Sequence, residues 1–281
     1  MLSLKAKFLL SLVITATMAT SYTSAETWKD VSYISKDAKE ADDAKDAKKA
    51  KLSDDYLQER AKLDIYCPEK AKNASVIVWF HGGGLRAGEK ELPERLLNND
   101  VCVVGPNYRL YPKIKSPVYI DDAARAVAWV YNNIEQYGGD KNKIVLSGHS
   151  AGGYLALMVG MDKQWLKKYG MDANKINQLV PFSGHTITHF TVREERGVKG
   201  EQPIVDELAP LFHVRKDAPP ITLITGDREL ELLGRYEENA YFYRMMKVNG
   251  HENIRIYEMD GYGHMMVEPS LPILLEIAKK L

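Results

Sequence analysis

The sequence has 281 residues, with 38 basic and 38 acidic side chains. This length fits one α/β domain and leaves little room for a second. The balanced charge provides no strongly basic surface of the kind that binds nucleic acid or an anionic membrane, so neither is expected as a partner.

Residues 1–25 have the pattern of a secretory signal peptide. Lys5 and Lys7 precede a short apolar run at residues 8–18, and small residues lead to Ala25. The run is shorter than the ~20 residues of a membrane-spanning helix. We predict cleavage after Ala25 and a secreted or periplasmic protein with no membrane contact. An uncleaved membrane anchor is the alternative.

Residues 26–59 are predicted to form a charged N-terminal arm or a partial cap. Between Lys36 and Lys51 nearly every residue is Lys, Asp, Glu or Ala, without the apolar stripe of a packed helix. The catalytic domain is then expected to occupy residues 60–281.

From residue 63 onward, short apolar segments alternate with segments of helical periodicity. Strands are predicted at residues 63–67, 75–80, 101–104, 144–146, 179–182, 221–225 and 254–257. Helices are predicted at residues 121–136, 151–161, 237–248 and 271–280. This alternation predicts an α/β fold with a mostly parallel, helix-covered sheet. Ligands of such sheets bind beyond the carboxyl ends of the strands.

The segment Gly148–Gly152 has the pattern G-x-S-x-G, between a predicted strand and a predicted helix. In that context the tight turn exposes the serine hydroxyl and the following helix directs its positive end toward developing negative charge. Ser150 is therefore the predicted nucleophile. The alternative is a glycine-rich turn whose serine has no catalytic role.

A serine nucleophile needs a general base and an acid that orients the base. Of the seven histidines, His264 follows the predicted strand that ends near residue 259, whereas His251 precedes that strand. We predict His264 as the base. Asp227 follows the preceding strand directly and is the predicted acid; Glu229 is the alternative, and Glu231 lies close by.

The residues Phe80-His-Gly-Gly-Gly84 follow a buried strand and match an oxyanion-hole motif. Backbone N–H groups of Gly83 and Gly84, together with that of Ala151, are predicted to bind the oxyanion. His81 is expected to brace this loop.

Together these motifs resemble the α/β-hydrolase esterases related to hormone-sensitive lipase, in particular the bacterial branch with kynurenine-formamidase-like and feruloyl-esterase-like enzymes. The motifs are HGGG at 81–84, NYRL at 107–110 with Pro112, GHSAGG at 148–153, Pro219-Pro220 to Gly226-Asp227, and Gly263-His264. The resemblance covers residues 60–281. It implies an eight-stranded sheet, no metal and no organic cofactor.

The sequence departs from this family at His149, where the lipase branch more often has Asp, and at residues 184–210, an individual insertion. His149, His189 and Phe190 are predicted to contact substrate. A metal site formed by His185 and His189 is not expected, because the segment lacks further ligands.

Two pairs of residues near these motifs are expected to have structural or surface roles. Arg193 and Arg196 are expected to be surface charges, with recognition of a substrate carboxylate as the alternative. In the implied fold, Tyr108 and Arg109 hold loops through hydrogen bonds.

The same fold places the strand ending at Cys67 antiparallel to the strand starting near Cys102. The two cysteines could then form a disulfide; the alternative is that both are small buried residues with free thiols.

Three functions fit these observations. The leading hypothesis is hydrolysis of a small-molecule or carbohydrate ester through an acyl-enzyme. Hydrolysis of a small amide, as by a formamidase, would use the same groups, and a non-catalytic binding protein could share the fold. The sequence leaves the oligomeric state open.

Overall fold

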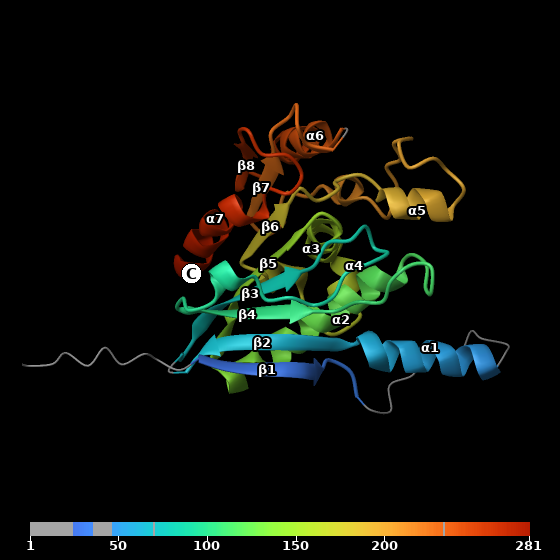
Figure 1. Ribbon diagram of the computed structural model, residues 1–281. Coiled ribbons are helices and arrows are strands. Elements are labelled where there is room, and N and C mark those ends of the chain that lie inside the picture. Colours follow the sequence, from blue (N-terminus) through green and yellow to red (C-terminus); the bar gives the residue numbers. More distant parts are fainter. Residues whose placement is uncertain (1–24, 36–46, 70, 233) are drawn as a thin grey trace, which may run out of the picture.

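The computed structural model describes residues 25–35, 47–69, 71–232 and 234–281 (Figure 1). Residues 1–24 of the predicted signal peptide and residues 36–46 of the charged segment lie outside this part. Among the described residues, no helix is both long and apolar enough to cross a membrane.

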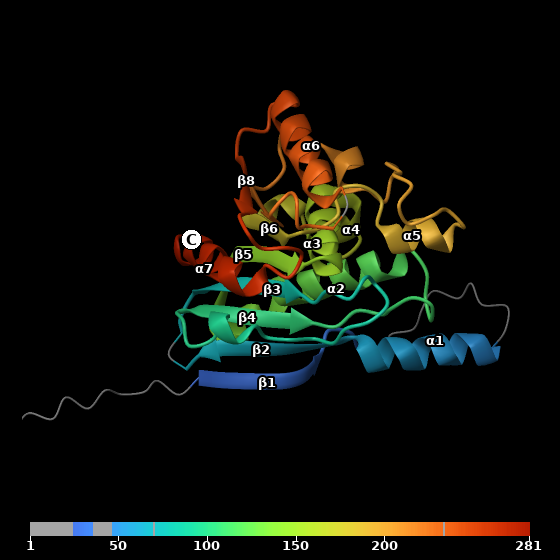
Figure 2. The same ribbon diagram turned by 45° about the horizontal axis from the view of Figure 1, so that its top comes forward.

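Eight strands form a single sheet (Figures 1 and 2). The strands are β1 (Ala25–Ser32), β2 (Lys62–Pro68), β3 (Ala74–Phe80), β4 (Val101–Pro106), β5 (Gly139–His149), β6 (Gln178–Phe182), β7 (Ile221–Gly226) and β8 (Ile254–Met259). Their order is β1-β2-β4-β3-β5-β6-β7-β8. The pairs β1–β2 and β2–β4 are antiparallel, and all other neighbours are parallel. This sheet confirms the predicted α/β class and its eight strands.

Helices cover both faces of the sheet. They are α1 (Ala47–Arg60), α2 (Val118–Asn133), α3 (Ala151–Met161), α4 (Lys163–Lys167), α5 (Phe190–Glu195), α6 (Arg235–Val248) and α7 (Val267–Lys279). Alternate residues of β3 point to opposite faces. Val76 and Val78 join the core beneath α2, α3 and α6, whereas Ile77 and Trp79 pack with α7. Burial on both faces explains why β3 is a continuous apolar run.

The N-terminal edge of the domain differs from the prediction. Residues 26–32, assigned above to an arm or partial cap, form edge strand β1 together with Ala25, the last residue of the predicted signal peptide, and pair with β2. Leu57 of α1 is fully buried in the core. The described parts of residues 26–59 thus belong to the folded domain, because β1 supplies hydrogen bonds that β2 would otherwise lack at its outer edge.

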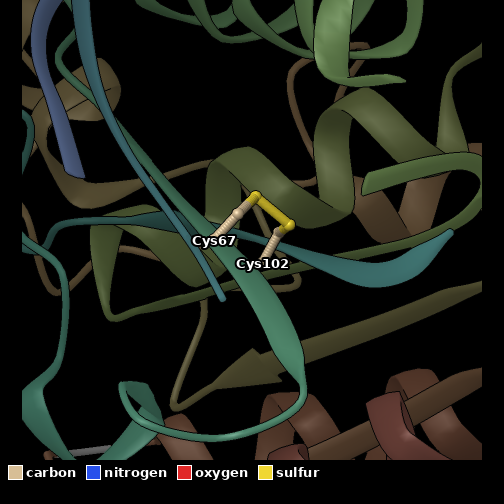
Figure 3. The surroundings of a disulfide bond; sticks show 2 residues. All are labelled: Cys67 and Cys102. Atoms are coloured by element: carbon tan, nitrogen blue, oxygen red, sulfur yellow. A yellow bond between two sulfur atoms is a disulfide. The ribbon is translucent and has the colours of Figure 1, made fainter. Parts of the chain in front are cut away.

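A disulfide joins Cys67 and Cys102 (Figure 3). It links the end of β2 to the start of β4, two strands that pair antiparallel and so meet at this point. Of the two alternatives left open by the sequence, the structure has the bridge. Because β4 starts here, the bridge lies at the amino ends of the parallel strands.

Candidate active site

Ser150 lies in the turn between β5 and α3, at the carboxyl end of the central strands. Its backbone has φ 55° and ψ −113°, a conformation rarely adopted by residues other than glycine. A Cβ atom at Gly148 would lie 2.5 Å from the carbonyl oxygen of Phe80, and one at Gly152 would lie 2.0 Å from the same atom. The two glycines are therefore required because the turn packs directly on β3.

The surroundings hold this strained turn in place. The N–H of Ser150 donates to the carbonyl of Phe182, and its own carbonyl accepts from the N–H of Tyr154. Every residue of α3 is buried, so the helix that begins after Ser150 is surrounded by protein. Ser150 itself keeps 8% of its surface exposed.

The glycine loop predicted to form the oxyanion hole lies beside Ser150. A Cβ atom at Gly82 would be 3.7 Å from the Ser150 Cβ. Gly83 and Gly84 both have positive φ, 101° and 64°. Within the described part of the chain, the backbone N–H groups of Gly83 and Gly84 donate to no acceptor. They are thus free to bind an oxygen of a ligand.

His81 braces this loop, as expected. Its ring stacks on Tyr108 with centroids 4.3 Å apart, and the Tyr108 hydroxyl donates to the His81 carbonyl at 2.9 Å. Burial lowers the pKa of His81 to about 4, so the ring is neutral at pH 7. Arg109 forms a buried ion pair with Asp122. Tyr108 and Arg109 therefore both hold loops through hydrogen bonds, as predicted.

His264 lies in the loop between β8 and α7 and pairs with Glu231. The distance from its Nδ1 to Glu231 Oε1 is 2.6 Å. A nitrogen this close to a carboxylate carries the proton, which leaves Nε2 unprotonated and able to act as a base. Burial raises the pKa of Glu231, but hydrogen bonds from His264 and Ser183 outweigh it and lower the value to about 2. Glu231 is therefore ionised at pH 7.

The prediction that Asp227 orients the imidazole does not agree with this geometry. The Asp227 carboxylate accepts hydrogen bonds from the backbone N–H groups of Gly261 and Glu229, both at 2.9 Å. The alternative, Glu229, has an exposed side chain. After Asp227 the chain makes a tight turn, in which Glu231 N donates to the Asp227 carbonyl at 2.8 Å. This turn directs Glu231 inward and leaves Asp227 to fix the loop that carries His264.

His149 connects the loop of His264 with the turn of Ser150. Its Nε2 donates to the carbonyl of His264 at 2.8 Å, and the two rings lie 4.7 Å apart. Burial lowers the pKa of His149 to about 4, and the neighbouring His264 contributes to the shift in the same direction. His149 also lines a groove of about 810 Å³, together with Glu94, Met265 and Glu268. The structure thus gives it a positioning contact, and contact with substrate stays a prediction.

The other predicted substrate contacts come from the insertion at residues 184–210. Phe190 approaches the glycine loop, since its Cζ lies 3.1 Å from the position of a Cβ on Gly84. His189 is fully buried and its Nδ1 accepts from the N–H of Thr191, which caps α5. Figure 1 shows α5 on the side toward which the parallel strands point. Phe190 is therefore better placed for substrate than His189.

The two arginines of this insertion have different surroundings. Arg196 forms a surface ion pair with Asp206, as expected. Arg193 is 3% exposed and donates to the carbonyl of Gln202 at 2.7 Å, so the expectation of a surface charge is wrong for this residue. Within the described chain, no group of three His, Cys, Asp or Glu residues could hold a metal ion.

A family model named BD-FAE matches residues 63–232, more than half of the sequence. The chain belongs to the BD-FAE family. Two curated relatives of this BD-FAE member are esterases. It is 25% identical to Esterase LipC of Mycobacterium tuberculosis over 205 residues, 66% of this chain and 50% of LipC. It is 38% identical to an arylesterase of Saccharolobus solfataricus over 96 residues, 32% of this chain and 31% of that protein.

A solved structure described as a truncated form of carbohydrate esterase from gut microbiota has the same fold as this BD-FAE member. The TM-score is 0.71 over 92% of this chain and 96% of that one, with 19% sequence identity. The α/β-hydrolase fold and the resemblance to its esterases are therefore confirmed. The chain spans about half the length of LipC and less of the arylesterase.

Proposed function

We propose that the protein is a serine carboxylic-ester hydrolase with Ser150 as nucleophile, His264 as general base and Glu231 as the acid that orients it. The pairing of His264 Nδ1 with buried Glu231 carries the proposal, because it leaves Nε2 free to accept a proton. The strained turn at Ser150 and the adjoining loop of His264, joined through His149, support it.

In the proposed reaction the Ser150 oxygen attacks the carbonyl carbon of an ester while its proton moves to His264 Nε2. The resulting oxyanion accepts hydrogen bonds from the backbone N–H groups of Gly83, Gly84 and Ala151. The C–O bond to the alcohol then breaks, and the alcohol leaves with the proton from Nε2. A water molecule, activated by His264, hydrolyses the acyl-enzyme and restores Ser150.

The oxyanion site is supported by the N–H groups of Gly83 and Gly84, which have no acceptor among the described residues and directly follow Gly82, the glycine beside Ser150. Ala151 is the first residue of α3, whose N-terminal end carries partial positive charge. An oxygen held here would therefore meet donors that are fixed before the reaction, which is the arrangement that stabilises a tetrahedral intermediate.

We propose short acyl or aryl esters, free or on carbohydrates, as substrates, and a location outside the cytoplasm. The Cys67–Cys102 disulfide supports this location, because such bonds persist mainly in oxidising compartments. The predicted signal peptide agrees with it.

The test uses p-nitrophenyl acetate and butyrate, an aryl formamide, and a fluorophosphonate probe that labels activated serines. The wild type should hydrolyse the esters and bind the probe. Ser150→Ala should lose activity by about 10⁴-fold or more and should not be labelled. Faster turnover of the formamide would indicate an amidase. A wild-type protein that neither reacts with the probe nor hydrolyses any of these substrates would favour a binding protein.

A further inference from the structure

We propose that Ser183, at the carboxyl end of β6, is a positioning residue of the active site. Its hydroxyl connects the Glu231 carboxylate with the Nδ1 side of His264 and holds the two groups in one arrangement. This inference rests on the proposed function of His264 and Glu231.

The geometry determines the role of the hydroxyl. Ser183 Oγ lies 2.5 Å from Glu231 Oε2 and 3.0 Å from His264 Nδ1. A hydroxyl has a single hydrogen, and ionised Glu231 can only accept. Ser183 therefore donates to Glu231 and accepts from the Nδ1–H of His264. That N–H is shared between the Ser183 oxygen and the other carboxylate oxygen of Glu231, at 2.6 Å.

This closed set of hydrogen bonds is satisfied by one tautomer of His264. With the proton on Nε2 instead, the Nδ1 lone pair would face a carboxylate oxygen at 2.6 Å. The Ser183 hydrogen could turn to Nδ1 only by leaving Glu231 Oε2, whose remaining donor is the N–H of Gly226 at 3.1 Å. Ser183 thus favours the tautomer that keeps Nε2 as a base.

The backbone fixes the position of this hydroxyl. Ser183 is fully buried and has φ 48°, a conformation uncommon for residues other than glycine. Its N–H donates to the carbonyl of Ile224 at 2.7 Å. A Cβ atom on the next residue, Gly184, would lie 2.6 Å from the backbone of Gly153 in α3. Ser183 is therefore held against the helix that follows Ser150.

Arg235 supports Ser183 from α6. Its guanidinium donates to the Ser183 carbonyl and, at 2.7 Å, to Nε2 of His185. The Nε of Arg235 is also 2.7 Å from Glu238 Oε1. Because Arg235 is 2% exposed, these contacts are shielded from water. The insertion, β6 and α6 thereby share one buried network behind the proposed acid–base pair.

The test compares two variants at this position with a matched control. Ser183→Ala removes the hydroxyl, and Ser183→Gly removes it while relieving the positive φ. Ser147→Ala is the control: Ser147 is also buried and donates to the Val180 carbonyl at 2.6 Å, away from Glu231 and His264. Denaturant midpoints establish that each variant is folded.

Both Ser183 variants should lower kcat by about 10- to 100-fold, the effect of one hydrogen bond to a charged group, with little change in KM. Upon acidification they should lose activity at a higher pH than the wild type. Without the Ser183 hydroxyl, the Glu231 carboxylate has one hydrogen-bond donor fewer. It therefore attracts protons more strongly, both at its own oxygens and at Nδ1 of His264. Ser147→Ala should leave kcat and the pH profile unchanged.

Wild-type kcat and an unmoved acid limb in both Ser183 variants would overturn the proposal. So would a lower kcat in Ser183→Ala that Ser183→Gly restores, because the backbone would then be the cause. A lower kcat with an acid limb that stays or moves to lower pH would also overturn it. These outcomes require an active wild type, so they are distinguishable from failure of the proposed function, in which the wild type itself has no serine-dependent activity.

Discussion

At the scale of single residues, the candidate site depends on which carboxylate reaches His264. Asp227 and Glu231 are four residues apart in one turn, yet they have different surroundings. Glu231 is buried and receives hydrogen bonds from His264, Ser183 and Gly226. Asp227 lies at the rim, where its carboxylate accepts from the backbone N–H groups of Glu229 and Gly261. A carboxylate bonded to the imidazole in a buried site stabilises its positive charge more than one in contact with solvent.

The variants Glu231→Gln and Asp227→Asn test this assignment. Glu231→Gln should lower kcat by about 10³- to 10⁴-fold, because an amide can turn its N–H₂ group toward Nδ1 and so favour the wrong tautomer. Asp227→Asn should lower kcat by less than about 10-fold, since the amide oxygen can still accept from Gly261 or Glu229. Steady-state hydrolysis of p-nitrophenyl acetate measures both. If Asp227→Asn is impaired as severely as Glu231→Gln, Glu231 is not the orienting acid.

At the scale of elements, the serine turn is positioned by the contact between β3 and α3. Gly152 lies so close to Phe80 that only a hydrogen fits between the helix and the strand. The glycine loop that we propose as the oxyanion site follows β3 directly, and Ser150 precedes α3. A shift between these two elements would therefore move the proposed N–H donors relative to the proposed nucleophile.

Gly152→Ala should lower both stability and activity. A Cβ atom 2.0 Å from a backbone oxygen requires backbone movement, at a cost of roughly 1–3 kcal/mol or more. Gly160→Ala, in the same helix, is the matched control. The three atoms nearest its Cβ all belong to the Leu179 side chain, at 2.5–3.1 Å, and a side chain can shift more easily than the backbone carbonyl that Gly152→Ala would meet. Alanine also favours helix by up to about 1 kcal/mol over glycine, so the loss of stability should be smaller at this position. Urea unfolding measures the stabilities. Equal losses at the two positions would contradict this explanation.

At the scale of the whole molecule, the stabilising disulfide and the candidate site lie at opposite ends of the sheet. The disulfide is at the amino ends of the parallel strands, whereas Ser150, Ser183 and Glu231 follow their carboxyl ends. The bridge connects cysteines 35 residues apart and ties β2 to the parallel part of the sheet. It restricts the unfolded chain without touching the candidate site.

Replacing both cysteines by alanine should lower the free energy of unfolding by about 2–4 kcal/mol and leave kcat within roughly twofold of wild type. Denaturant unfolding and ester turnover measure the two effects. Adding a reductant to the wild type, at a denaturant concentration where the chain unfolds transiently, should reproduce the loss of stability. A large fall in kcat with stability retained would show that the bridge acts on the site instead.

The sequence by itself determined strands β2 to β8, helices α2, α3, α6 and α7, the serine turn, the glycine loop and the position of His264 in the chain. These features depend on local patterns: apolar runs for buried strands, glycines where backbones touch, and a histidine in a loop after a strand. The same patterns could not show that residues 25–32 add an eighth strand at the edge, because pairing partners are distant in the chain. The tertiary structure also decided between Asp227 and Glu231. Both follow the same strand, and only the direction of a tight turn and the buried hydroxyl of Ser183 select the carboxylate that faces the imidazole.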